Sequence, residues 1–169
     1  MSDHPRREAA ADRQTITDLI YRYCRAMDRM DHEQGYAIWH EDGTADYGPD
    51  IFQGTGKGFI DWVCESHKHL DAHTHQISNI VIELDGDRAG SEAYVTATLR
   101  RESEGKHMQI TAWSRYIDQW SKRDGRWGID KRVTVMDFDE MREVAPMKQH
   151  SQGSRDHADP SYAAIRGLR

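Results

Sequence analysis

The sequence has no apolar run that approaches the roughly 20 residues of a membrane-spanning helix. No apolar signal-peptide core follows the charged residues 1–8. It also lacks a basic block, because its 23 Lys and Arg residues are spread among 29 Asp and Glu residues, for a net charge of −6. This charge argues against nucleic acid or an anionic membrane as a partner. We therefore expect a cytoplasmic protein whose partners are small molecules or proteins.

Cysteine is scarce. Only Cys24 and Cys64 are present, and each lies within an apolar helical pattern. Isolated thiols in such patterns indicate buried structural residues rather than a disulfide or a metal site. A chain of 169 residues is long enough for one domain with a substantial core, and a second domain would be hard to fit.

The N-terminal half has helical periodicity. Apolar residues recur every three or four positions over 12–29, which predicts an amphipathic helix preceded by a flexible segment, residues 1–11. A short helix is expected within 31–40 and another over about 58–70. Between them, residues 44–49 and 51–54 are typical of short strands around a Gly-Pro turn.

After the third predicted helix the period changes to two. Alternation predicts four strands, at about 77–85, 88–101, 107–121 and 125–138, and the Gly-containing turns between them favour hairpins of an antiparallel sheet. Helices followed by a curved meander predict an α+β cone over residues 12–140 that encloses a pocket. Residues 141–169 are polar, and we interpret them as a C-terminal tail that caps the pocket or a neighbouring subunit.

Two histidines, His73 and His75, stand at the entry of the first long strand. An imidazole titrates near neutral pH, so a histidine beside a pocket is a candidate for proton transfer. Two alternatives remain open at this point. Both histidines could be exposed loop residues, or they could bind a metal ion with Asp28 as a third ligand.

Three motifs carry a family resemblance: residues 23–28 at the end of the first helix, residues 75–79 at the start of the first long strand, and residues 130–132 in the last strand. With these motifs, residues 12–138 resemble a SnoaL-like member of the nuclear-transport-factor-2-like superfamily. They are most similar to its lyase branch, which includes scytalone dehydratase, hexachlorocyclohexane dehydrochlorinase and bile acid 7α-dehydratase. The resemblance implies a cone-shaped α+β fold and a catalytic Asp28–His75 dyad.

The resemblance also implies that Tyr23 and Arg132 bind a substrate oxygen. Their alternatives are a core aromatic and an outward-facing, salt-bridging arginine. The sequence departs from the dehydrochlorinase pattern, which has lysine at the Tyr23 position. It also has no clear equivalent of the second histidine or second aspartate of the two dehydratases, although Thr98 lies near that place. We further expect four residues to bind substrate along the pocket: Tyr47, Trp62, Thr98 and Trp113.

These residues predict a cofactor-independent, metal-free lyase or isomerase of aromatic compound catabolism, acting on a small apolar or aromatic substrate by dehydration, a similar elimination or deformylation. The alternatives are a non-catalytic assembly subunit resembling the β subunit of a ring-hydroxylating dioxygenase, and a polyketide cyclase. Because the sheet has no cleanly polar face, we expect a homo-oligomer. The resemblance favours a trimer, with a dimer next.

Overall fold

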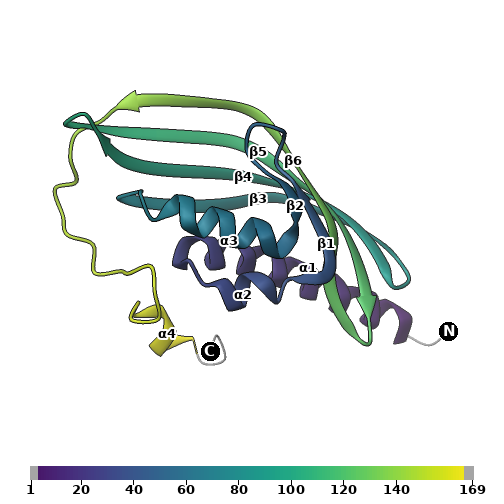
Figure 1. The fold of residues 1–169 in the computed structure, drawn as a ribbon. Helices are drawn as coiled ribbons and strands as arrows, with labels where there is room; N and C mark the ends of the chain where they lie inside the picture. The colour runs from purple at the N-terminus through teal and green to yellow at the C-terminus, as the bar shows by residue number, and fades with distance from the viewer. Residues whose placement is uncertain (1–3, 166–169) are drawn as a thin grey trace.

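A curved, open six-stranded sheet forms one layer of the protein, and helices cover one of its faces (Figure 1). The computed structural model describes residues 4–165. The strands lie side by side in the order β2-β1-β6-β5-β4-β3. The elements are, in chain order, α1 (His4–Arg29), α2 (His32–Tyr36), β1 (Trp39–Asp46), β2 (Gln53–Thr55), α3 (Gly56–His67), β3 (Ala72–Asp85), β4 (Arg88–Ser103), β5 (Lys106–Arg123), β6 (Arg126–Glu143) and α4 (Ser161–Ala164).

The predicted meander of four long strands is confirmed. Strands β3 to β6 pair antiparallel with their sequence neighbours, and each hairpin turns at a glycine with positive φ: Gly86, Gly105 and Gly125. Only glycine adopts such angles without a steric cost, so these positions fix the ends of the strands. The α+β class is likewise confirmed.

The sheet is mixed rather than purely antiparallel, because β1 pairs parallel with β6. Periodicity finds strands but not their partners, and a parallel partner far along the chain leaves no turn signal between the two. The helix predicted from residue 12 begins at His4 instead, and the strand predicted from residue 77 begins at Ala72. His73 and His75 are therefore ladder residues of β3, opposite Leu99 and Ala97, and not loop residues.

The core lies between the helices and the inner face of the sheet. On α1, Ile16, Ile20, Tyr23 and Met27 follow the helical period and are all at most 2% exposed. α3 packs closely on β1 at its first residue, where a Cβ on Gly56 would lie 2.2 Å from the Trp39 ring. Both predicted buried thiols, Cys24 and Cys64, are buried and free.

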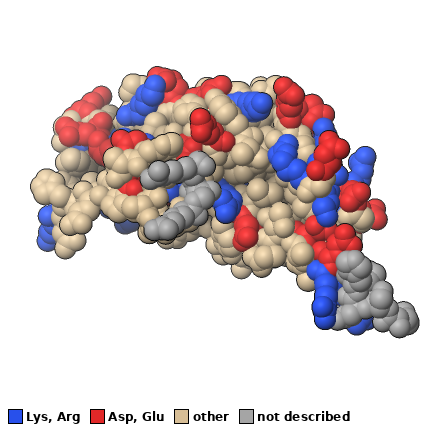
Figure 2. Space-filling view, turned by 90° about the horizontal axis from the view of Figure 1, so that it is seen from below, with Lys and Arg blue, Asp and Glu red and all other residues tan. Residues whose placement is uncertain are grey.

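After β6 the chain passes to the helical side, where α4 lies beside α1 and α2 (Figure 1). Figure 2 shows this side of the molecule, where acidic and basic side chains are interspersed rather than gathered into a patch of one sign. In residues 4–165 no helix is long and apolar enough to cross a membrane.

Candidate functional site

Asp28 and His75 form a hydrogen-bonded pair where the end of α1 meets β3. Oδ1 of Asp28 lies 2.7 Å from Nδ1 of His75, and Oδ2 accepts the backbone N–H of His75 at 3.1 Å. The two side chains are only 13% and 9% exposed. Because a carboxylate only accepts hydrogen bonds, this contact places a proton on Nδ1 and leaves Nε2 with a free lone pair when the ring is neutral.

The helix and the strand place this pair without any unwinding of α1. Tyr23 and Met27, four residues apart, share the helix face that lines a pocket, while Asp28 reaches His75 from the side. Tyr23 and Asp28 are five positions apart, about 140° around a helix, so both could face one pocket only if the helix end unwound. The structure agrees with this: α1 stays helical to Arg29, Tyr23 and His75 line the pocket, and Asp28 does not line it but is hydrogen-bonded to His75.

The pocket has a volume of about 240 Å³ between α1, α3 and the inner face of the sheet. Its walls are largely apolar, and its polar groups are hydroxyls and imidazoles. The polar lining residues are Tyr23, Tyr47, Ser66, His67, His75, Ser114, Tyr116 and Thr134, and the apolar ones are Met27, Ile51, Phe59, Trp62, Val63, Ala97, Leu99, Ala112 and Met136.

Two tyrosine hydroxyls meet in this pocket. Tyr23 Oη and Tyr47 Oη are 2.5 Å apart, and the Tyr47 ring stacks on Phe59 with 3.8 Å between centroids. Burial raises the pKa of both tyrosines, so both hydroxyls stay protonated at neutral pH. A pair of phenols shares one internal hydrogen bond, which leaves a second O–H free to donate to a ligand.

Arg132 lies behind these tyrosines rather than in the pocket lining. Its side chain is 0% exposed, and Nε and Nη2 each donate to Asp118 at 2.7 Å. The guanidinium lies 4.0 Å from the ring centroids of both Tyr23 and Tyr116. Among residues 4–165, its buried Nη1 has no hydrogen-bond partner. Any effect of Arg132 on a ligand therefore passes through the tyrosines that separate the two.

The four predicted substrate-binding residues divide into two groups. Tyr47 and Trp62 line the pocket, whereas Thr98 and Trp113 are not among its lining residues. Trp113 instead stacks on Phe138 with 4.8 Å between centroids. Trp113 alternates with Ala112 and Ser114, which line the pocket, so it belongs to the opposite, outer face of the sheet.

In the alternative of a metal site Asp28 would be the third ligand, but both of its oxygens already accept hydrogen bonds from His75. Nδ1 of His75 binds Asp28, and Nε2 of His73 lies 3.0 Å from the carbonyl oxygen of Met27. Within residues 4–165, no group of three or more His, Cys, Asp or Glu side chains is arranged to hold a metal ion.

Comparison of the sequence with models of known protein families shows to which family this chain belongs. Residues 8–133 match the model of the SnoaL-like domain. The chain belongs to the SnoaL-like domain family. This confirms the predicted resemblance, and among curated proteins none matches the chain in sequence.

Solved structures similar to this SnoaL-like domain include several enzymes. A candidate scytalone dehydratase from Novosphingobium aromaticivorans is 21% identical, with a TM-score of 0.69 over 85% of this chain and 97% of that one. A hexachlorocyclohexane dehydrochlorinase from Novosphingobium barchaimii is 20% identical, with a TM-score of 0.70 over 89% and 99%. A candidate aromatic ring hydroxylase from N. aromaticivorans is 20% identical, with a TM-score of 0.63 over 80% and 94%. At such identities the likeness establishes the fold alone.

Sequence reasoning missed one prominent residue of the SnoaL-like pocket, His67. It follows Phe59 and Val63 at intervals of four on α3, so helical periodicity already placed it on the buried face. Its ring centroid lies 4.5 Å from that of His73 and 6.3 Å from that of His75. Burial, followed by the two neighbouring imidazoles, lowers the pKa of His67 to about 3. His67 is therefore a neutral group at physiological pH.

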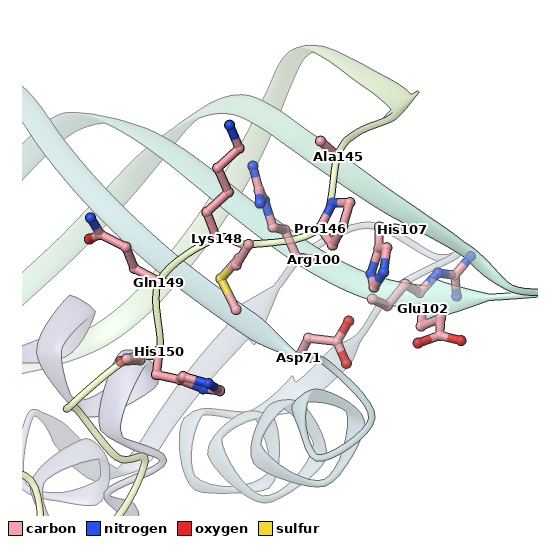
Figure 3. A pocket seen from close by; sticks show the side chains of 12 residues that line it. Asp71, Arg100, Glu102, His107, Ala145, Pro146, Lys148, Gln149 and His150 are labelled. Carbon is pink, nitrogen blue, oxygen red and sulfur yellow. The ribbon is translucent and has the colours of Figure 1, made fainter.

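A second cavity, of about 330 Å³, lies beside the C-terminal tail (Figure 3), and neither Asp28 nor His75 lines it. The tail segment 145–151 forms one side of it, while Asp71, Arg100 and Glu102 belong to the other. A cavity therefore separates this part of the tail from the end of β4 and the start of β5.

Proposed function

We propose that this SnoaL-like protein is a cofactor-independent lyase or isomerase that acts on a small, largely apolar or aromatic substrate. The observation that carries the proposal is the Asp28–His75 hydrogen bond of 2.7 Å beside an apolar pocket. A carboxylate that holds Nδ1–H orients the imidazole and stabilises its protonated form, which makes Nε2 an effective base.

In the proposed reaction, Nε2 of His75 removes a proton from a carbon next to a substrate carbonyl or aromatic ring. The C–H electron pair becomes a carbon–carbon double bond as the bond to a neighbouring hydroxyl breaks, and the imidazolium returns the proton so that water leaves. In an isomerase the same proton returns to another carbon. Neither route changes the oxidation state of the protein, and acid–base action of this kind contributes roughly 10²–10⁴-fold in rate.

The tyrosine pair supports binding of the substrate oxygen in this proposal. The free O–H of Tyr23 or Tyr47 would donate to a carbonyl whose charge grows as the proton leaves. The buried Arg132 cation, 4.0 Å from the Tyr23 ring, would favour negative charge there without touching the substrate. A cavity of about 150 Å³ holds a benzene molecule, so the 240 Å³ here favours a substrate of about one substituted ring.

The test is a panel of small alcohols, ketones, β-diketones, epoxides and halogenated compounds with one ring, each followed for product formation. For any compound that is turned over, Asp28→Asn and His75→Ala should lower kcat by about 100-fold or more. His69→Ala is the matched control, because His69 is an exposed histidine just beyond α3. The proposal fails if no compound is converted and the protein purifies from its native host with a larger catalytic subunit.

That failure would favour the second candidate, a non-catalytic assembly subunit. The observation in its favour is the outer face of the sheet, which no helix covers and where Tyr94 and Phe138 are 42% and 61% exposed. An assembly subunit would use this face, whereas a polyketide cyclase would use the same pocket as the lyase and convert β-diketones in the panel.

A further inference from the structure

The C-terminal tail is fastened to the helices directly behind the candidate site. Tyr162 is 5% exposed and its hydroxyl donates to Asp31 at 2.5 Å, while Arg25 lies over its ring at 4.4 Å. Arg29 donates to the carbonyl oxygen of Ser154 at 3.0 Å. Residues 154–162 therefore form an anchored segment, in contrast to residues 145–151, which border the cavity of Figure 3.

Within the anchored segment, Arg155 binds the end of α3. Nη1 donates to the carbonyl oxygen of His67 at 2.7 Å, and Nη2 donates to that of Leu70 at 2.8 Å. His67 is the last residue of α3, whose terminal carbonyl groups have no partner within the helix, and Leu70 lies in the turn that follows, so one guanidinium with a rigid fork of donors binds both. The same Nη1 lies 3.5 Å from Nδ1 of His73.

These contacts determine which ring nitrogen of His73 carries a proton. Nε2 faces the carbonyl oxygen of Met27 at 3.0 Å, and a carbonyl can only accept, so Nε2 carries a proton. Nδ1 faces a guanidinium, which can only donate, so a second proton there would point at a positive charge. His73 is thus held as the neutral Nε2–H tautomer.

His73 in turn holds the backbone that presents the catalytic carboxylate. Its acceptor is Met27, the residue immediately before Asp28, and Asp28 makes two hydrogen bonds to His75. A continuous set of contacts therefore runs from Arg155 through His73 and Met27 to Asp28.

We propose that Arg155 is a positioning residue for the Asp28–His75 pair. Its guanidinium prevents protonation of His73 at Nδ1 and so keeps the proton on Nε2. The Nε2–H group then donates to the Met27 carbonyl and holds the end of α1 in place. This inference rests on the proposed function for its catalytic meaning, but its structural content can be measured without a substrate. The tail would thereby be an integral part of the site although none of its described residues lines the pocket.

The groups around His73 together favour its neutral form. Burial lowers its pKa, the Met27 carbonyl and Asp28 raise it, and His75 and Arg155 lower it. His67, whose ring is 4.5 Å away, is itself held neutral by burial. Removal of the Arg155 cation should therefore raise the pKa of His73, since a nearby positive charge opposes protonation.

The experiment is nitrogen NMR of the histidine rings in the full-length protein, with His73 assigned by His73→Gln. In the wild type we expect the neutral Nε2–H tautomer of His73. In Arg155→Met we expect a mixture of tautomers and a His73 titration midpoint higher by about one pH unit, the size expected for a charge near 4 Å that is largely screened. Arg155→Lys should restore most of the midpoint, because it restores the charge.

Arg142→Met is the matched control, since Arg142 is an exposed arginine on β6, outside the anchored segment, whose ion pair is with Glu140. It should leave the His73 signals unchanged. The proposal is overturned if wild-type His73 carries its proton on Nδ1, or if Arg155→Met leaves both tautomer and midpoint as in the wild type. Should Arg155→Met fail to fold, Arg155→Gln replaces it, because an amide can still donate to a carbonyl oxygen but carries no charge: a higher His73 midpoint supports the proposal, and a wild-type midpoint overturns it. Failure of the proposed function would be recognised differently: His75→Ala would turn over substrate at the wild-type rate, while the His73 signals of the wild type and the Arg155 variants would still be as expected here.

Discussion

At the scale of residues, two imidazoles in one pocket have opposite electrostatic surroundings. His75 is hydrogen-bonded through Nδ1 to the Asp28 carboxylate, whereas His67 is buried beside His73 and His75 and has a pKa of about 3. Of these two, the first suits proton transfer, and the second suits a neutral hydrogen-bonding group on the pocket wall.

This difference predicts the acid sensitivity of the fold. Unfolded His67 binds a proton below its ordinary pKa of about 6.5 while folded His67 does not, so the free energy of unfolding should fall as pH drops from 6.5 toward 3. One such proton contributes a slope of about 1.4 kcal/mol per pH unit. Urea denaturation of His67→Gln between pH 4.5 and 7.5 should show a shallower slope than the wild type, whereas His69→Gln should not. Equal slopes in wild type and His67→Gln would contradict the buried, neutral state of His67.

At the scale of elements, a buried ion pair joins β5 to β6. Asp118 and Arg132 face each other across this pair of strands, and both side chains are fully buried. Periodicity placed Arg132 in the last strand but could not say which way it faces, because β6 alternates between residues of mixed polarity. Arg132 faces inward because Asp118, which lies opposite it on β5, supplies a buried carboxylate to pair with it.

Removal of one partner of the Asp118–Arg132 ion pair should lower the free energy of unfolding more than replacement of both partners by apolar residues. Asp118→Leu leaves an uncompensated buried cation, and we expect a loss of about 3–5 kcal/mol in the free energy of unfolding. The double variant Asp118→Leu/Arg132→Met should recover most of that loss, because an apolar pair of similar volume carries no desolvation cost. Urea denaturation of both variants tests this. A double variant no more stable than Asp118→Leu would show that the arginine is stabilised by the tyrosine rings rather than by the ion pair.

The local patterns of the sequence predicted the features that depend on residues close together in the chain, and they did not predict contacts between distant segments. The helical period of α1, the three hairpin turns and the Asp28–His75 pairing were predicted, the last through the family resemblance. The parallel pairing of β1 with β6, the place of Trp113 on the outer face and the contact of Arg155 with α3 were not. Each of these depends on segments far apart in the chain, and neither periodicity nor turn chemistry records such partners.

At the scale of the whole molecule, the sheet has one face covered by helices and one face open. The open face carries Tyr94, Trp113 and Phe138 beside an Arg115–Asp137 ion pair of 2.9 Å. Exposed aromatic residues of this kind mark interaction surfaces. We propose that copies of this chain associate through this face, with a trimer favoured and a dimer next.

Light scattering of the purified protein tests the association. The wild type should have the mass of an oligomer, and Phe138→Glu should shift it toward the monomer, because a carboxylate in an apolar interface has no partner. Tyr21→Glu changes an exposed aromatic residue on α1 and should leave the mass unchanged. A monomeric wild type would contradict this proposal but would leave the catalytic one intact.

The central claim is that His75, held by Asp28, moves a proton of the substrate. The most direct measurement is the single-turnover rate of C–H bond cleavage, followed as deuterium exchange from D₂O or as product formation, with a substrate taken from the panel. We predict that His75→Ala loses about 100-fold or more while His69→Ala retains the wild-type rate. A loss of less than tenfold in His75→Ala would contradict the claim and leave the pocket as a binding site.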